Sequence, residues 1–156
     1  MADDARQVAN WFVTRARQDG RSLSIMSLLK LTYIAHGWYL ESRNEPLFPN
    51  HIEAWQYGPV VPEVYRDFRR QGITVQAPVN TVREYDFPPE DAALLEQVWE
   101  IYGSLPPFRL SDITHVPNGP WDVASRMRGH YARIPDDLIR NHYVELRARA
   151  EAASNA

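Results

Sequence analysis

Residues 24–42, SIMSLLKLTYIAHGWYLES, decide the fold of this protein. Apolar residues recur in this stretch at the three- and four-residue spacing of an α-helix, and other apolar residues occupy the remaining faces. A helix that is apolar nearly all round lies in the interior, since it has no polar face to present to water. We therefore predict a central helix that is capped by Ser22 or Ser24, ends near Ser42 and is covered by the rest of the chain.

Amphipathic segments on both sides predict the helices that cover it. The first helix begins at Asp3 or Asp4, has Gln7 in capping-box spacing and ends near Gln18. Later helices begin at prolines, which suit the first helical turn, and span residues 62–72, 89–103 and 135 onward. Short helical turns are expected near residues 110–115 and at Trp121, after a break at Pro106 and Pro107.

Residues 45–61 depart from the helical pattern. Prolines interrupt them, and residues 52–57 alternate loosely between apolar and polar, as a strand does. We expect a small β-sheet or hairpin here, and the loop at residues 73–87 has room for one further strand. The whole pattern predicts a mainly α (α+β) fold in a single compact domain over residues 1–156, with about six helices and a frayed tail from about residue 148.

The composition excludes several classes of function. Cysteine is absent, which rules out disulfides, thiolate nucleophiles, iron–sulfur clusters and zinc ribbons. The phosphate-binding patterns GxGxxG and GxxxxGK(S/T) do not occur. The net charge of -3 and the pI of 5.9 are opposite to the strongly basic surface that nucleic acid requires, so nucleic acid is a disfavoured partner.

Two further features bear on location and partners. No apolar stretch approaches the roughly 20 residues that cross a bilayer, and the N-terminal MADDARQ is acidic where a signal peptide is basic. We therefore expect a cytoplasmic protein without a membrane partner. The chain has 5 Trp, 8 Tyr and 5 Phe residues, a number that serves either a large core or a protein interface.

Three segments carry a family resemblance: KLTYIAHGWYL at residues 30–40, PLFPNHIEAWQYGPVVPEVYRDFRRQG at 46–72 and THVPNGPWDVA at 114–124. They resemble the signature of the Panacea-domain family, which includes the SocA-like antitoxins. The chain departs from that pattern at residues 43–45 and at Pro106 and Pro107. We expect the following motif residues to be structural: Lys30, Tyr33, His36, Gly37, Trp38, Pro62, Thr114, His115, Pro120 and Trp121.

The resemblance implies an antitoxin of a toxin–antitoxin system that neutralises its cognate toxin by direct protein binding. For the SocA-like branch it also implies a proteolytic adaptor that delivers the toxin to a ClpXP-type protease. Neither role needs a chemical step, so the resemblance implies no enzyme, no catalytic residue, no cofactor and no metal. The sequence indicates no oligomeric state.

The segment GPVVP at residues 58–62 is the most unusual local feature, and it has two interpretations. Its glycine and prolines form either a rigid ledge for a partner or a structural corner that leads the strand into the next helix. Aromatic and basic side chains surround it and complete the set of candidate partner-binding residues: Trp55, Tyr57, Gly58, Pro59, Val60, Tyr65, Arg66 and Arg69. There are two basic clusters: Arg66, Arg69 and Arg70 on the expected third helix, and Arg126, Arg128 and Arg133 after Trp121. Solvated helix surface is the simpler interpretation of both clusters.

Two alternative functions remain at this stage. The first two helices, joined by a turn at Gly20, could form a helix-turn-helix of a transcriptional regulator, although the second is too apolar for a recognition helix. A hydrolase would use Asp112, His115 or His36, which otherwise serve as helix caps, turn hydrogen bonds and a buried histidine. No Cys and no recognisable Ser or Thr nucleophile motif lies beside these residues.

Overall fold

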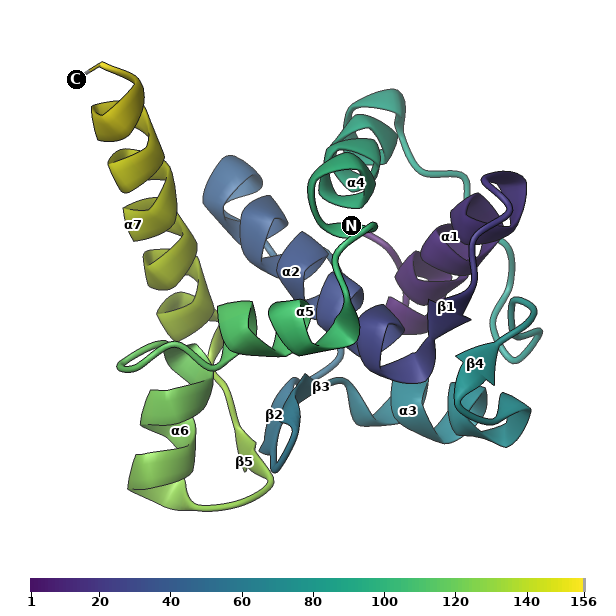
Figure 1. The fold of residues 1–156 in the computed structure, drawn as a ribbon, viewed down its shortest axis with the longest axis horizontal. Helices are drawn as coiled ribbons and strands as arrows, with labels where there is room; N and C mark the ends of the chain where they lie inside the picture. The colour runs from purple at the N-terminus through teal and green to yellow at the C-terminus, as the bar shows by residue number, and fades with distance from the viewer. Residues whose placement is uncertain (156) are drawn as a thin grey trace.

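Helix α2 (Ile25–Arg43) forms the centre of the computed structural model, which describes residues 1–155 (Figure 1). The hydroxyl of Ser24 caps it by accepting a hydrogen bond from the Ser27 amide at 3.0 Å. Asn44 ends it in the left-handed conformation, with a φ of 56°. Fourteen of its 19 residues are buried, which confirms the prediction of a central helix.

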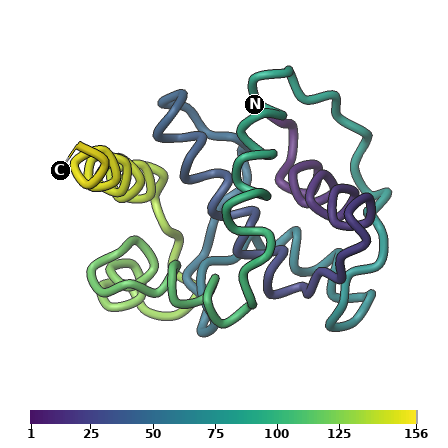
Figure 2. The backbone as a smooth tube through the Cα atoms, turned by 45° about the horizontal axis from the view of Figure 1, so that its top comes forward, coloured from purple at the N-terminus to yellow at the C-terminus, as the bar shows by residue number. Residues whose placement is uncertain are grey.

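Within residues 1–155 there are six further α-helices, and five of them, all except α6, pack against α2. The capping box of α1 is present as predicted, because the Gln7 side chain accepts from the Asp4 amide while Asp4 caps the first turn. Helices α1 and α7 lie on opposite sides of α2 (Figure 2), and α4 and α5 also contact it. The bounds are α1 Ala5–Gln18, α3 Pro62–Phe68 with a following 3-10 turn η1 Arg69–Gln71, α4 Pro89–Tyr102, α5 Pro107–Thr114, α6 Pro120–Arg128 and α7 Asp136–Ser154.

Two small antiparallel sheets complete the fold. Strands β2 (Glu53–Trp55) and β3 (Gly58–Val60) form the predicted hairpin, and β5 (Ala132–Arg133) pairs with the other edge of β2. Strand β1 (Leu23–Ser24) pairs with β4 (Thr74–Val75), the one strand expected in the loop at 73–87. The sequence did not predict β5, because two residues are too few to show an alternating pattern.

The structure corrects the expected bounds of three helices. The expected break precedes α5, but α5 begins at Pro107, whereas a turn was expected only from about residue 110. Helix α6 has 9 residues where a single turn was expected. Helix α7 continues to Ser154, so its backbone does not end near residue 148. Its last turns are rich in alanine, a strong helix former, and an ion pair between Arg147 and Glu41 ties it to α2.

Helix α4 presents one large apolar residue to the outside. Leu95, Val98 and Trp99 are buried, and the indole nitrogen of Trp99 donates a hydrogen bond to Asp19 at 2.7 Å. Ile101 lies on the same helix, but 62% of its surface is exposed. Within residues 1–155, no helix is both long and apolar enough to cross a membrane.

Candidate functional site

The turn between β2 and β3 is held tightly against the centre of the fold. Trp55 and Gly58 face each other at the end of the hairpin, and Gly58 has a φ of 124°, which favours glycine. A Cβ at this position would lie 2.6 Å from the Nζ of Lys30 and 3.0 Å from the Cε1 of His115. Only glycine therefore fits where the turn passes α2 and the end of α5.

Lys30 fixes the turn from the side of α2. Its side chain is fully buried, and its ammonium donates a hydrogen bond to the carbonyl oxygen of Tyr57 at 2.6 Å. Burial lowers the pKa of Lys30 to about 8, because removal from water disfavours the charged form. Lys30 is also the only lysine in the sequence, a signal that could have marked it as an unusual position.

Trp121, near the start of α6, holds the same hairpin through a second carbonyl group. Its indole nitrogen donates to the carbonyl oxygen of Trp55 at 2.7 Å. Its ring packs against the ring of His115, with 4.2 Å between the centroids, and Nδ1 of His115 donates to the carbonyl of Ser111. Pro120 is buried at the start of α6. Segments about 90 residues apart along the chain, at Lys30 and Trp121, thus hold two carbonyl groups of one turn.

An aromatic surface lies beside this turn. We define it as Trp55, Tyr65, Tyr131 and Arg69. The ring of Trp55 contacts Tyr65 and Tyr131 edge to face, with centroid distances of 5.1 and 5.6 Å, and Arg69 lies 5.8 Å from the centre of the Tyr65 ring. Trp, Tyr and Arg are the residues most enriched in the energetic centres of protein interfaces.

Tyr131 is the member of the aromatic surface that the sequence did not predict. It is 66% exposed and has a φ of 65°, a conformation that is uncommon for a bulky residue. Its amide donates to the carbonyl of Ala54 at 2.9 Å, which holds the strained backbone against β2. Strain of this kind concentrates at functional positions, and it comes from tertiary contacts that no local sequence pattern reveals.

The other candidate partner-binding residues divide into exposed and buried groups. Tyr57 is 65% exposed at the tip of the turn, and Arg66 and Arg69 are exposed on α3 and η1. Gly58, Pro59 and Val60 are all buried, which favours the structural corner over the ledge for a partner. These three residues form the corner that leads into α3 at Pro62, because β3 packs directly against α2.

The remaining motif residues lie in the core or near it. His36 is fully buried, donates from Nε2 to the carboxylate of Asp136 at 2.9 Å and packs on the Phe48 ring. Gly37 lets the ring of Tyr143 approach α2, where a Cβ would lie 2.1 Å from that ring. Tyr33 also packs edge to face on Tyr143. Trp38 is half-buried at a groove between α2, α4 and α7.

Thr114 and His115 offer the nearest approach to a hydroxyl–imidazole pair at this site. The hydroxyl lies 3.5 Å from Nδ1 of His115, but it donates to the carbonyl of Ser111 at 3.0 Å. Nδ1 faces the same carbonyl, so neither group is free to activate the other. The arrangement is suited to binding, and the buried α2 likewise has no polar face to serve as a recognition helix for DNA.

Comparison with known proteins gives two matches and one negative result. Residues 28–122 match the family model described as "Antitoxin SocA-like, Panacea domain". The chain is similar to Antitoxin SocA of Caulobacter vibrioides (strain NA1000 / CB15N), with 32% identity over an alignment that covers 90% of this chain and 82% of that protein. No solved structure matches the chain.

Proposed function

Because the chain belongs to the SocA-like, Panacea-domain family of antitoxins, we propose that it neutralises its cognate toxin by direct binding through the aromatic surface. The observation that carries this proposal is the cluster of Trp55, Tyr65 and Tyr131 beside a turn that Lys30 and Trp121 hold in place. Neutralisation by contact requires a surface of this kind and no chemical step.

A rigid aromatic cluster favours tight binding for a physical reason. Ordering one flexible side chain at an interface costs about 0.5–1.5 kcal/mol of binding free energy. The rings of the aromatic surface already contact one another in the unbound chain, and Trp55 donates from its indole to the carboxylate of Glu53 at 2.9 Å. Most of this ordering is therefore complete before a toxin binds. The free energy gained by burying the rings then contributes to the affinity with little loss to ordering.

The charges near the aromatic surface indicate the chemistry of the toxin's contact patch. Arg69 has no ion-pair partner within residues 1–155, and Arg66 has only Glu63 at a loose 3.9 Å. Arg133 is exposed on β5, the strand that follows Tyr131. Free guanidinium groups beside aromatic rings favour a partner that offers Asp or Glu side chains, with which arginine forms paired hydrogen bonds.

The proposed role extends to delivery of the bound toxin to a ClpXP-type protease in the cytoplasm, with this chain acting as a single-domain adaptor. Resemblance to the SocA-like branch supports this step. Measurement of the toxin's half-life in cells tests it: the half-life should shorten when this protein is present and lengthen again when the protease is removed. A half-life that does not respond to the protease would leave occlusion as the whole mechanism.

Co-purification with the product of the adjacent gene tests the binding role. Trp55→Ala and Tyr65→Ala should each weaken the complex by at least about tenfold, because truncation of an aromatic anchor typically costs about 2 kcal/mol or more. Phe108→Ala is the matched control, since Phe108 is 66% exposed on α5 and is not part of the aromatic surface. Each variant needs a melting curve, because Trp55 and Tyr65 also pack against the core.

The proposal fails if the purified protein neither binds nor neutralises its neighbour. It also fails in its choice of surface if Trp55→Ala and Tyr65→Ala fold normally and bind as tightly as Phe108→Ala. If a substitution both lowers the melting temperature and weakens binding, Tyr131→Ala distinguishes loss of contact from loss of folding. Tyr131 is largely exposed, so its side chain contributes little to the core.

A further inference from the structure

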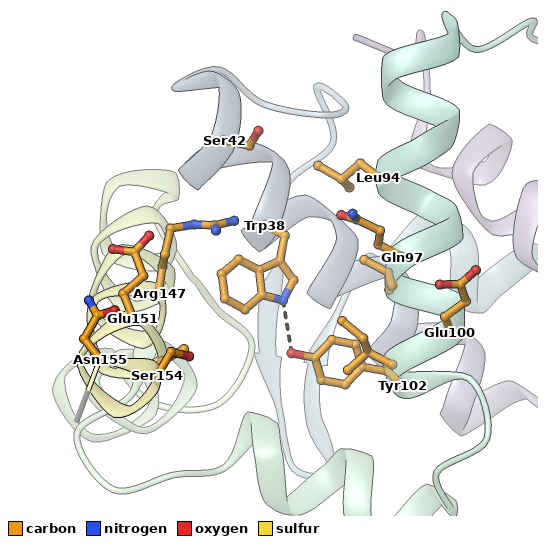
Figure 3. A pocket seen from close by; sticks show the side chains of 13 residues that line it. Trp38, Ser42, Leu94, Gln97, Glu100, Tyr102, Arg147, Glu151, Ser154 and Asn155 are labelled. Atoms are coloured by element: carbon orange, nitrogen blue, oxygen red, sulfur yellow. Dashed lines mark hydrogen bonds between the residues drawn. The ribbon is translucent and has the colours of Figure 1, made fainter.

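A groove of about 660 Å³ opens between α2, α4 and α7. Trp38 lies at its centre, with α4 on one side and the last turns of α7 on the other (Figure 3). The groove lies toward the C-terminal end of α2, whereas Lys30 and the hairpin turn lie toward the N-terminal end. It is therefore separate from the aromatic surface, and its volume falls within the range of about 300–1,000 Å³ that is usual for ligand sites.

The floor of the groove is rigid before anything binds. The indole nitrogen of Trp38 donates to the hydroxyl of Tyr102 at 3.1 Å, and the Tyr143 ring meets the indole edge to face at 4.8 Å. The guanidinium of Arg147 lies 5.5 Å from the centre of the same indole. Since its only donor is already used, Trp38 offers an occupant the apolar part of its ring that Arg147 and Tyr143 leave uncovered.

The walls add apolar surface, part of which is exposed. Leu94, Val98 and Ala150 line the groove, and Ile101 stands at its side with 62% of its surface exposed. An isoleucine exposed to this extent, next to a half-buried tryptophan, indicates a surface whose burial by a partner would be favourable.

The unmatched charges around the groove are negative. Glu100 projects from α4 and Glu151 from α7, and neither forms an ion pair with any residue between 1 and 155 (Figure 3). The one lining arginine, Arg147, is paired with Glu41 of α2. An occupant with Lys or Arg side chains therefore complements this groove, whereas an acidic one does not.

We propose that the groove binds an α-helical segment of a partner protein, with apolar side chains at helical spacing and flanking Lys or Arg residues. All three walls are helices, whose backbone groups are hydrogen-bonded internally, so an extended peptide would find no strand edge to pair with. A helix brings its own backbone hydrogen bonds and can insert one apolar face at positions i, i+3, i+4 and i+7. This proposal does not depend on the role of the aromatic surface.

Model peptides of about 15 residues, roughly four helical turns, test the proposal by fluorescence anisotropy with the full chain. One peptide has leucines on one face and lysines on the other, a second replaces the lysines with glutamates, and a third is the basic peptide with a central proline that prevents a helix. We expect the basic helical peptide alone to bind in the micromolar range, with an affinity that falls as salt rises.

Variants of the chain locate the binding. Together, Glu100→Gln and Glu151→Gln should weaken binding by about two- to tenfold, the usual effect of two exposed charge pairs, and Ile101→Ser should weaken it as well. The matched controls are Glu84→Gln and Ile73→Ser, which alter exposed residues of the same types outside the groove and should leave the affinity unchanged. Equal binding of the acidic or proline-containing peptide, an equal effect of the control variants, or no binding at all would overturn the proposal.

Discussion

Lys30 is a charged side chain that the protein keeps in its interior. Its hydrogen bond to the Tyr57 carbonyl stabilises the turn, while its removal from water opposes the charge and lowers its pKa to about 8. Because the pKa is lowered although the hydrogen bond favours the charged form, desolvation outweighs the hydrogen bond. The role of Lys30 is therefore to set the position of the turn more than to raise stability.

The titration of Lys30 can be followed directly, because a sample labelled with 15N-lysine contains one labelled side chain. We expect a midpoint near pH 8. Since the folded pKa lies below that of the unfolded chain, the native state binds fewer protons between about pH 8 and 10.5, and the free energy of unfolding should rise with pH across that window. Lys30→Met should remove this rise. An ordinary lysine titration near pH 10.5 would contradict the burial of the ammonium.

Gly58 is the second residue on which the turn depends. Gly58→Ala should lower the free energy of unfolding by about 2–4 kcal/mol, because it combines a positive φ with steric overlap at Lys30. Gly72→Ala is the matched control, since Gly72 also has a positive φ, of 94°, but no atom lies within 4 Å of the place that its new Cβ would take. Chemical denaturation should show a clearly smaller loss for Gly72→Ala, and equal losses would mean that Lys30 and His115 leave room at the turn.

Helix α2 and the hairpin show how far local sequence patterns reach. The cap at Ser24, the apolar faces of α2 and the hairpin were predicted, because each depends on residues close together in the chain. The sequence did not predict strand β5, the exposure of Ile101 or the conformation of Tyr131, because tertiary contacts determine all three.

The candidate site was predicted in part for the same reason. Trp55 and Tyr65 were selected from their residue type, and the structure places them side by side. The burial of Gly58, Pro59 and Val60 follows from the packing of β3 on α2, which the sequence of the hairpin does not contain. The hydrogen bond from Trp121 to Trp55 joins residues 66 positions apart and could not be read from either segment.

The contact between α2 and α7 depends on one small residue. Gly37→Ala should lower the free energy of unfolding by at least about 1–3 kcal/mol, because the new Cβ would overlap the ring of Tyr143. Thermal unfolding measures this loss. The double variant with Tyr143→Leu should recover part of it, since the smaller side chain leaves space, and the absence of such coupling would show that Gly37 is not the point of close approach.

The molecule as a whole places two dissimilar surfaces around one buried helix. The aromatic surface, with its free arginines, lies beside the hairpin turn near the start of α2, and the groove, with its free glutamates, lies near the end of α2. The aromatic surface favours a partner with acidic side chains, and the groove favours one with basic side chains. The two proposed contacts, with a toxin and with a helical segment, would therefore not compete for one surface.

Hydrogen–deuterium exchange of the chain, with and without its purified toxin, tests the central claim most directly. Binding through the aromatic surface predicts slower exchange in residues 53–66 and 128–133, with little change in α1 and α4. The same pattern should be absent with Trp55→Ala at equal toxin concentration. Protection that leaves the hairpin turn and Tyr131 unchanged, and falls on α1 or α4 instead, would contradict the account.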